Sequence, residues 1–148
     1  MLAASAIFAL ALSVSTGAAA DCPSAGTEPL VVASVLDGAT VRLADSSEVR
    51  LADIDAPSRR LALPAGAPWP IGDQARERLA TIVAAGNLTV AWASPEPDRY
   101  GRRHAYVFAN GAPVAQILLE EGLARAREYP GGGACFPAFL TAEQRALA

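Results

Sequence analysis

Apolar and β-branched runs, or hydrophobic and polar positions that alternate, predict β-strands in five segments that turn or loop sequences separate. The predicted strands cover residues 30–36, 40–43, 49–54, 87–93 and 102–109. Asp37-Gly38 closes the first segment, and Asn110-Gly111, a strong turn signal, closes the last. The first three strands follow one another closely, so the pattern predicts a meander there.

Apolar residues recur at helical spacing in three other segments, which predict helices over 72–85, 113–121 and 139–147. The proline-rich stretch 56–70 is predicted to be an irregular loop, and 123–127 a short extended piece. Five short strands with an inserted helix favour an α+β, mainly β fold. A small five-stranded OB barrel with about three helices fits, although other α+β domains share this pattern.

The first twenty residues carry no charged side chain, and an apolar run over 3–14 leads to Ala18-Ala19-Ala20. This arrangement predicts a signal peptide over 1–20 with cleavage before Asp21. The alternative is a membrane anchor, but the run is shorter than the roughly 20 residues that a span needs. We therefore expect an exported protein, periplasmic or secreted, whose mature domain covers 21–148 without a membrane span.

All twelve basic residues are arginine, and the formal net charge is −3. Strong non-specific nucleic-acid binding depends on neutralising phosphates, so a net acidic chain excludes a broadly basic binding protein. Nucleic-acid binding is expected to be weak and to depend on a local arginine cluster. Nothing indicates a protein partner, and a monomer is expected. With one histidine and no Cys-x-x-Cys, a zinc site is not expected.

The two cysteines, Cys22 and Cys135, favour a disulfide in an exported chain, although two unrelated thiols are the alternative. Closing a loop of roughly 100 residues stabilises a fold by about 4–5 kcal/mol in the chain-entropy account. This bond would join the start of the mature chain to the loop before the last helix.

Four segments occur in an order and spacing that resemble the staphylococcal nuclease (thermonuclease-like) family. They are Val35–Val41, Val49–Pro57, Asp98–Arg102, and the Asn-Gly turn followed by Leu118 to Ala124. The resemblance covers about residues 30 to 127, and the chain is similar to a divergent member. It implies an OB barrel capped by helices and, in active members, calcium-dependent phosphodiester cleavage of DNA and RNA.

Phosphodiester hydrolysis needs positive charge at the phosphorus, a divalent ion and a base for the attacking water. The resemblance implies that Arg50 and Arg102 are the catalytic arginines, because a guanidinium can bond two phosphate oxygens at once. Surface ion pairs, with Glu48 or Asp98 for example, are the alternative. The resemblance also places Arg99 and Tyr100 along the substrate, where Tyr100 could stack on a base or else only pack within its loop.

Asp55 matches a calcium ligand of the family, the carbonyl of Ala56 could add an oxygen, and Asp37 keeps the first aspartate of the Asp-Gly-Asp-Thr turn. Ala39 stands where the family has its second aspartate, and Ser58 where it has the glutamate that serves as candidate base. Calcium takes six to eight oxygen ligands, so a weak or absent site is expected. A positioned base is worth roughly 10²–10⁴ in rate, so activity is expected to be weak or lost. Whether the chain is an active nuclease or a pseudo-nuclease stays open.

A shifted metal site using Asp37, Asp53 and Asp55 would be an alternative if the third strand is regular, because residues two apart share a face. The favoured interpretation is that Asp53 is solvated at the strand end. His104, mid-strand, is interpreted as structural or surface.

Arg59 and Arg60 either add positive potential or form a solvated loop face, and Trp69 and Trp92 are predicted to be packing anchors. The alternative function is a non-catalytic exported OB module that binds an anion, nucleic acid or a protein partner, or that is purely structural.

Overall fold

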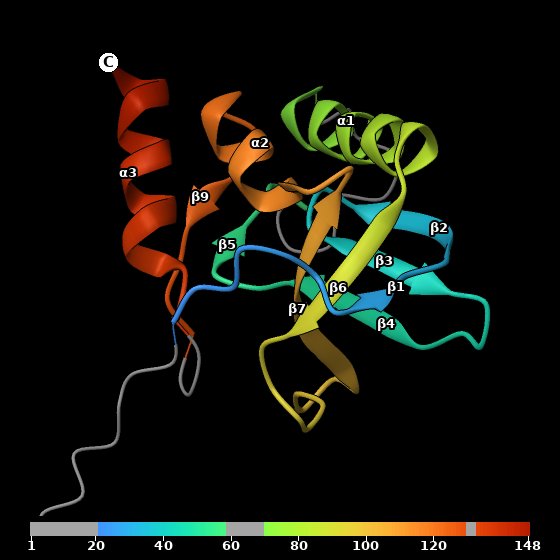
Figure 1. Ribbon diagram of the computed structural model, residues 1–148. Coiled ribbons are helices and arrows are strands. Elements are labelled where there is room, and N and C mark those ends of the chain that lie inside the picture. The colour runs from blue at the N-terminus through green and yellow to red at the C-terminus, as the bar shows by residue number, and fades with distance from the viewer. Residues whose placement is uncertain (1–20, 59–69, 130–132) are drawn as a thin grey trace, which may run out of the picture.

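A computed structural model describes residues 21–58, 70–129 and 133–148 (Figure 1). The strands are β1 (Glu28–Pro29), β2 (Val32–Asp37), β3 (Thr40–Leu43), β4 (Glu48–Leu51), β5 (Ile54–Asp55), β6 (Leu88–Trp92), β7 (Arg102–Ala109), β8 (Ala112–Pro113) and β9 (Arg125–Ala126). The helices are α1 (Pro70–Ala85), α2 (Val114–Glu120) and α3 (Phe136–Leu147). All three predicted helices are present. Arg59, Arg60, Trp69 and most of the predicted loop over 56–70 lie outside the described residues.

The main sheet curls because one stretch of chain supplies both of its edges. Its order is β1-β6-β7-β4-β3-β2, and β1 and β2 are separated by only Leu30 and Val31. The predicted first strand over 30–36 corresponds to β2, which begins at Val32 and pairs with β3, whereas β1, which pairs with β6, precedes the predicted bounds. β4 and β7 run parallel, and the other ladders are antiparallel. This curled sheet, which three helices accompany, confirms the predicted OB-type fold.

The core lies between the inner face of this sheet and the helices that cover it. The fully buried side chains of the sheet include Val41, Val49, Leu51, Val90 and Phe108. α1 and α2 pack over one end of the sheet, and α3 packs beside α2 and β9 (Figure 1). The buried helix residues are Ala75, Leu79 and Ile82 in α1, Val114, Leu118 and Leu119 in α2, and Phe139 and Ala142 in α3. Within the described residues, we find no helix whose length and apolar character would suit a membrane span.

The third predicted strand is not regular, which corrects the expectation for Asp53. β4 ends at Leu51 because Asp53 has a φ of 59°, in the left-handed region where extended pairing stops. The chain then forms β5, which pairs with β9 instead of the main sheet. Asp53 and Asp55 consequently do not share the face of one regular strand.

Asp53 is also buried, with an exposed fraction of 1%, and is not solvated. Its Oδ2 accepts hydrogen bonds from the Tyr106 hydroxyl at 2.7 Å and from the Cys135 amide at 3.0 Å. These donors make burial of the carboxylate tolerable. Burial, together with the hydrogen bond and charge of Asp53, raises the pKa of Tyr106 well above its usual value.

The structure contains the expected disulfide between Cys22 and Cys135, whose Cα atoms lie 4.6 Å apart across a sequence separation of 113. The bond joins the first described residues to the start of α3. Because the Cys135 amide also binds Asp53, the covalent link and the buried carboxylate fix the same segment.

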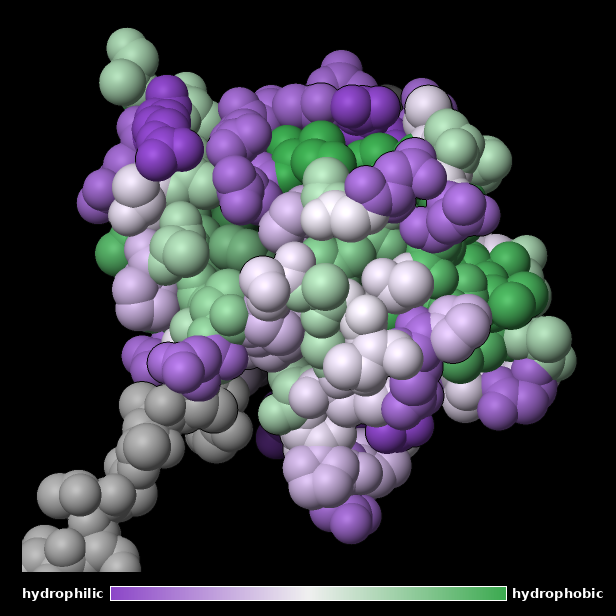
Figure 2. Space-filling view, viewed as in Figure 1, coloured by the Kyte–Doolittle hydropathy of each residue, from purple (hydrophilic) through white to green (hydrophobic). Residues whose placement is uncertain are grey.

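Hydrophobic residues gather on the surface at the side where β2 lies (Figure 2). A groove of about 520 Å³ opens there between the β1–β2 junction and the end of α1. Its lining is Pro29, Leu30, Val31, Val32, Val83, Gly86, Asn87, Leu88 and Thr89. None of these side chains is charged, so this groove offers nothing that would attract a phosphate group.

Candidate functional site

Arg50 is a largely buried cation at the centre of the candidate site. It lies on β4 with an exposed fraction of 8%. Its Nη2 donates to Asp55 Oδ1 at 2.5 Å and to the Tyr129 hydroxyl at 3.1 Å, and its Nη1 lies 3.4 Å from Thr40 Oγ1. Its Nε is buried without a hydrogen-bond partner among the described residues. A buried guanidinium needs such anionic and polar neighbours to offset its lost hydration.

The pKa of Arg50 lies above its ordinary value. Burial by itself lowers this pKa, but the hydrogen bond to Tyr129 and the charges of Tyr129, Asp55 and Asp37 outweigh burial and raise it. The site therefore keeps a fixed positive charge at every pH at which the protein is folded.

Asp98 organises the loop between β6 and β7. Its Oδ1 accepts the amides of Tyr100 at 2.9 Å and Arg102 at 3.0 Å. Its Oδ2 accepts Arg102 Nε at 3.0 Å and lies 3.1 Å from His104 Nε2. Gly101, with a φ of 76°, lets the chain turn back onto the carboxylate. The ion pair that sequence left as an alternative for Arg102 is thus present.

These contacts hold the pKa of Asp98 far below its usual range. Burial alone raises that pKa, but the Arg102 amide, His104, the Arg102 side chain and the Tyr100 amide together lower it by more. The carboxylate is therefore ionised at neutral pH, where it orients Arg102.

The parallel register of β4 and β7 brings the two predicted arginines onto one face. Arg50 lies opposite His104, and Arg102 is two residues before His104 on the same strand, so all three side chains share a face. Tyr129 contacts two of these residues, His104 and Arg50. Its ring centroid is 5.2 Å from that of His104 and 5.9 Å from the Arg50 Cζ.

The other predicted substrate residues lie at the tip of the same loop. Tyr100 is 66% exposed, and its ring centroid lies 4.8 Å from the Arg99 Cζ and 5.0 Å from the Arg102 Cζ. These are cation–π distances, so the loop presents one accessible aromatic face flanked by two guanidinium groups. Trp92, predicted as a packing anchor, is partly buried, and its ring centroid lies 3.5 Å from the Arg103 Cζ.

Asp55, one of the two predicted metal ligands, has both carboxylate oxygens in ion pairs with arginine. Oδ1 is bound by Arg50 and Oδ2 by Arg127, whose Nη1 lies 3.1 Å away. Arg127 also places its Cζ 5.2 Å from the Tyr129 ring centroid. We call Arg50, Arg102 and Arg127 the arginine cluster.

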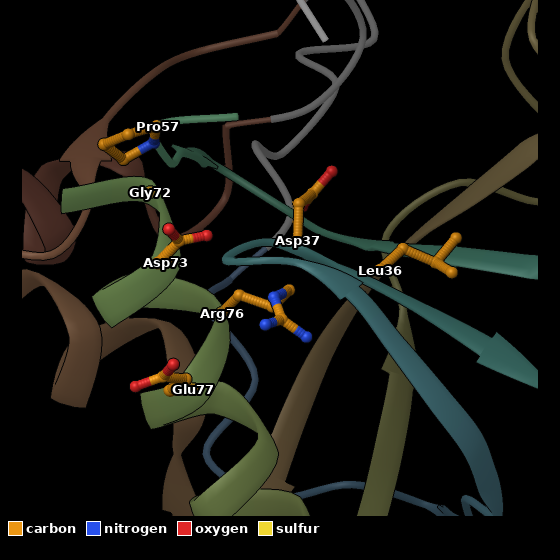
Figure 3. Close-up of a pocket in the computed structure, with 7 residues that line it drawn as sticks. All are labelled: Leu36, Asp37, Pro57, Gly72, Asp73, Arg76 and Glu77. Carbon is orange, nitrogen blue, oxygen red and sulfur yellow. The ribbon is translucent and has the colours of Figure 1, made fainter. Parts of the chain in front are cut away.

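Asp37, the second predicted ligand, lies at the end of β2, where its Oδ1 accepts the Ala39 amide at 2.8 Å. It lines a pocket of about 370 Å³ between the end of β2 and the first turns of α1 (Figure 3). The other lining residues are Leu36, Pro57, Gly72, Asp73, Arg76 and Glu77. The turn is tightly packed: a Cβ on Gly38 would lie 2.6 Å from the Ala75 Cβ and 2.9 Å from the Ala56 Cβ.

The donor set at Asp55 does not fit calcium. A calcium ion needs several free oxygens with carboxylate charge. Here the oxygens of Asp55 bind guanidinium groups, and Ala39 contributes no carboxylate. No group of three or more His, Cys, Asp or Glu side chains in the described ranges could hold a metal ion. The shifted site using Asp37, Asp53 and Asp55 does not form, because Asp53 is turned into the core.

Sequence reasoning missed Tyr129 and Arg127, and it assigned His104 no role at the site. Arg127 ends the predicted extended piece over 123–127 and Tyr129 follows it, but nothing in this local pattern indicates that their side chains reach Asp55 and Arg50. Their importance arises only because β9 pairs with β5 and so brings them to Asp55. The single usable sequence signal was an arginine and a tyrosine just before the glycine run.

The family described as "Staphylococcal nuclease homologue" matches residues 48–148, which is more than half of the chain. Endonuclease YncB of Bacillus subtilis (strain 168) is 33% identical over 94 residues, covering 61% of this chain and 44% of YncB. SPbeta prophage-derived endonuclease YokF of the same organism is 34% identical over 94 residues, covering 61% of this chain and 31% of YokF. The chain thus spans less than half the length of these curated relatives. As the four sequence segments indicate, it belongs to the staphylococcal nuclease family.

Proposed function

We propose that this chain binds phosphate groups of nucleic acid through Arg50 and Arg102 and has weak or no calcium-dependent phosphodiester hydrolysis. The observation that carries the proposal is the pairing of these arginines on one face of β4 and β7, beside an Asp55 whose two carboxylate oxygens are both bound by guanidinium groups. Family membership and two endonuclease relatives support a nucleic-acid ligand.

The arginines supply charge stabilisation and position, which are two of the requirements of phosphodiester chemistry. Arg50 is held by Asp55 and Tyr129, and Arg102 by Asp98, so both guanidinium groups are oriented before a ligand arrives. Tyr100 offers an exposed ring for a neighbouring base. What is missing is a base for water, because Ser58 stands in the position of the family's glutamate.

The second candidate is a non-catalytic exported module that binds an anion or a protein partner. The ion pairs of Arg50 and Arg102 favour it, because they give both arginines a structural role. We also propose export to the periplasm or the exterior, since the predicted signal peptide and the disulfide agree on an oxidising compartment.

The test incubates the oxidised protein with single-stranded DNA and RNA, in calcium and in chelator, and measures both cleavage and binding. We expect negligible cleavage in either condition, and binding that weakens in Arg50→Ala and Arg102→Ala but not in the control Arg145→Ala. Arg145 lies in the last turn of α3, and in the described part of the chain it forms an ion pair with Glu120 at 3.9 Å. Efficient calcium-dependent cleavage would overturn the loss of activity, and binding unaffected by both substitutions would overturn the proposed ligand.

A further inference from the structure

We propose that Arg127 takes the place of a divalent cation beside Asp55, so that this site binds phosphate groups without metal. The inference rests on the proposed function and adds to it the means by which Asp55 is neutralised. It follows from a disagreement: the family implies calcium at Asp55, whereas this chain surrounds the same carboxylate with guanidinium groups.

The backbone fixes the position of Arg127. β9 pairs with β5, with Asp55 opposite Arg125, and the Arg127 amide donates to the Asp53 carbonyl at 2.9 Å. The side chain then reaches Asp55 Oδ2, whereas Arg50 binds Oδ1. Two cations therefore share one carboxylate, and the group of three carries a net charge of about +1 at neutral pH.

The donors of Arg127 are available to a ligand. Its side chain is 58% exposed, and it makes one hydrogen bond to Asp55 among the described residues. A guanidinium has five N–H donors, so several can face a phosphate. Arg50, which is buried, binds the other oxygen of the same carboxylate. The pair presents an open donor above a fixed buried charge, which suits an anion more than a metal ion.

Arg127 also opposes a metal ion directly. A calcium ion at Asp55 would have to displace a bound guanidinium and then lie beside Arg50 and Arg127, with which it shares the sign of charge. Ala39 and Ser58 supply no carboxylate to compensate. The absence of the family's two acidic residues and the presence of Arg127 therefore both lower the expected affinity for calcium.

The first experiment titrates a 5′-phosphorylated single-stranded tetranucleotide into the oxidised protein by calorimetry, in chelator and in calcium. We expect equal affinity in both conditions, and a loss of about tenfold or more in Arg127→Ala. The matched control is Arg125→Ala, an exposed arginine of β9 that pairs with Asp55 through the backbone but whose side chain forms no ion pair with it in the described part of the chain. Affinity that requires calcium, or that is unchanged in Arg127→Ala, would overturn the inference.

The same titration separates this inference from the proposed function. If Arg127→Ala binds normally while Arg50→Ala does not, only the role of Arg127 fails. If neither substitution weakens binding, the proposed function fails as well.

A second experiment measures the thermal midpoint with and without calcium. We expect no shift for the wild type or for Ser58→Glu, and a calcium-dependent rise for Ser58→Glu combined with Arg127→Ala, because ligand binding stabilises the folded state. Both variants leave Ala39 unchanged, because it is fully buried and its site has no room for a larger side chain. An equal rise in Ser58→Glu alone would show that Arg127 does not exclude the metal.

Discussion

At the scale of single residues, Asp98 joins the loop after β6 to the strand that follows it. One carboxylate binds two amides, one guanidinium and the single histidine of the chain. Both the turn and the direction of the Arg102 side chain therefore depend on it. A phosphate that binds Arg102 meets a guanidinium whose orientation has already been set.

We predict that Asp98→Asn lowers stability by about 1–3 kcal/mol and weakens phosphate binding, because charged hydrogen bonds are lost and Arg102 is released. The folded pKa of Asp98 is depressed, so its contribution is present above the unfolded pKa near 3.9 and is lost as pH falls through the folded value. Urea unfolding at several pH values would measure this. The difference between wild type and variant should shrink as pH falls below about 4.

The control for this prediction is Glu96→Gln, an exposed residue of the same loop. It should leave both stability and its pH dependence nearly unchanged. A difference between wild type and Asp98→Asn that does not vary with pH would show that the carboxylate charge is not what holds the loop.

Sequence motifs located Arg50 and Arg102, but they could not show the surroundings of Asp53. An aspartate within Ala52-Asp53-Ile54 has no local feature that indicates burial. Its partners, Tyr106 and Cys135, come from 53 and 82 residues away. Such a long-range contact is decided by how the strands and α3 pack, and periodicity within a short window carries no information about it.

At the scale of secondary structure, the segments with strong periodicity were predicted well. β7 has the predicted bounds, and the three helices differ from prediction by at most three residues at either end. The errors fall where tertiary pairing overrides local pattern. The first strand begins two residues late because the chain passes there from β1, which pairs with β6, to β2, which pairs with β3. The third ends early because of the left-handed residue Asp53.

The segment between β9 and α3 is held at both ends, which makes the disulfide matter for the site. Tyr129 contacts Arg50 near its beginning, and Cys135 binds both Cys22 and Asp53 at its end. Loosening the end of this segment gives Tyr129 more freedom. A ligand that binds must then order this segment again, and the conformational entropy lost in doing so opposes binding.

We predict that Cys22→Ser combined with Cys135→Ser lowers stability by up to about 4–5 kcal/mol and also weakens phosphate binding. Thermal melts and the tetranucleotide titration, each with and without reductant, would measure both effects. The wild type should respond to reductant and the double variant should not. Unchanged binding after reduction, with the fold intact, would separate the disulfide from the site.

At the scale of the whole molecule, positive charge at the site stands against a net charge of −3. A polyanion is therefore attracted locally by the arginine cluster and repelled by the rest of the surface. We therefore expect a nucleic acid to contact a small area of the protein and not an extended surface.

We predict a shallow salt dependence for single-stranded DNA. With three arginines in contact, the slope of log K against log salt should be about −2, and Arg102→Ala should reduce it by about 0.7. Fluorescence titrations at several salt concentrations would measure the slope. A much steeper value would indicate a broad basic surface, and a value near zero would indicate that phosphates are not bound.

The covalent link between Cys22 and Cys135 also bears on how the protein responds to mechanical force. Residues 23–134 lie inside the closed loop, and this interval contains every strand of the sheet. A pull applied to the chain outside the two cysteines is carried by the sulfur–sulfur bond and bypasses the barrel. A protease that threads its substrate through a narrow pore would therefore have to reduce this bond, or admit a doubled chain, before it could extract the arginine-bearing strands.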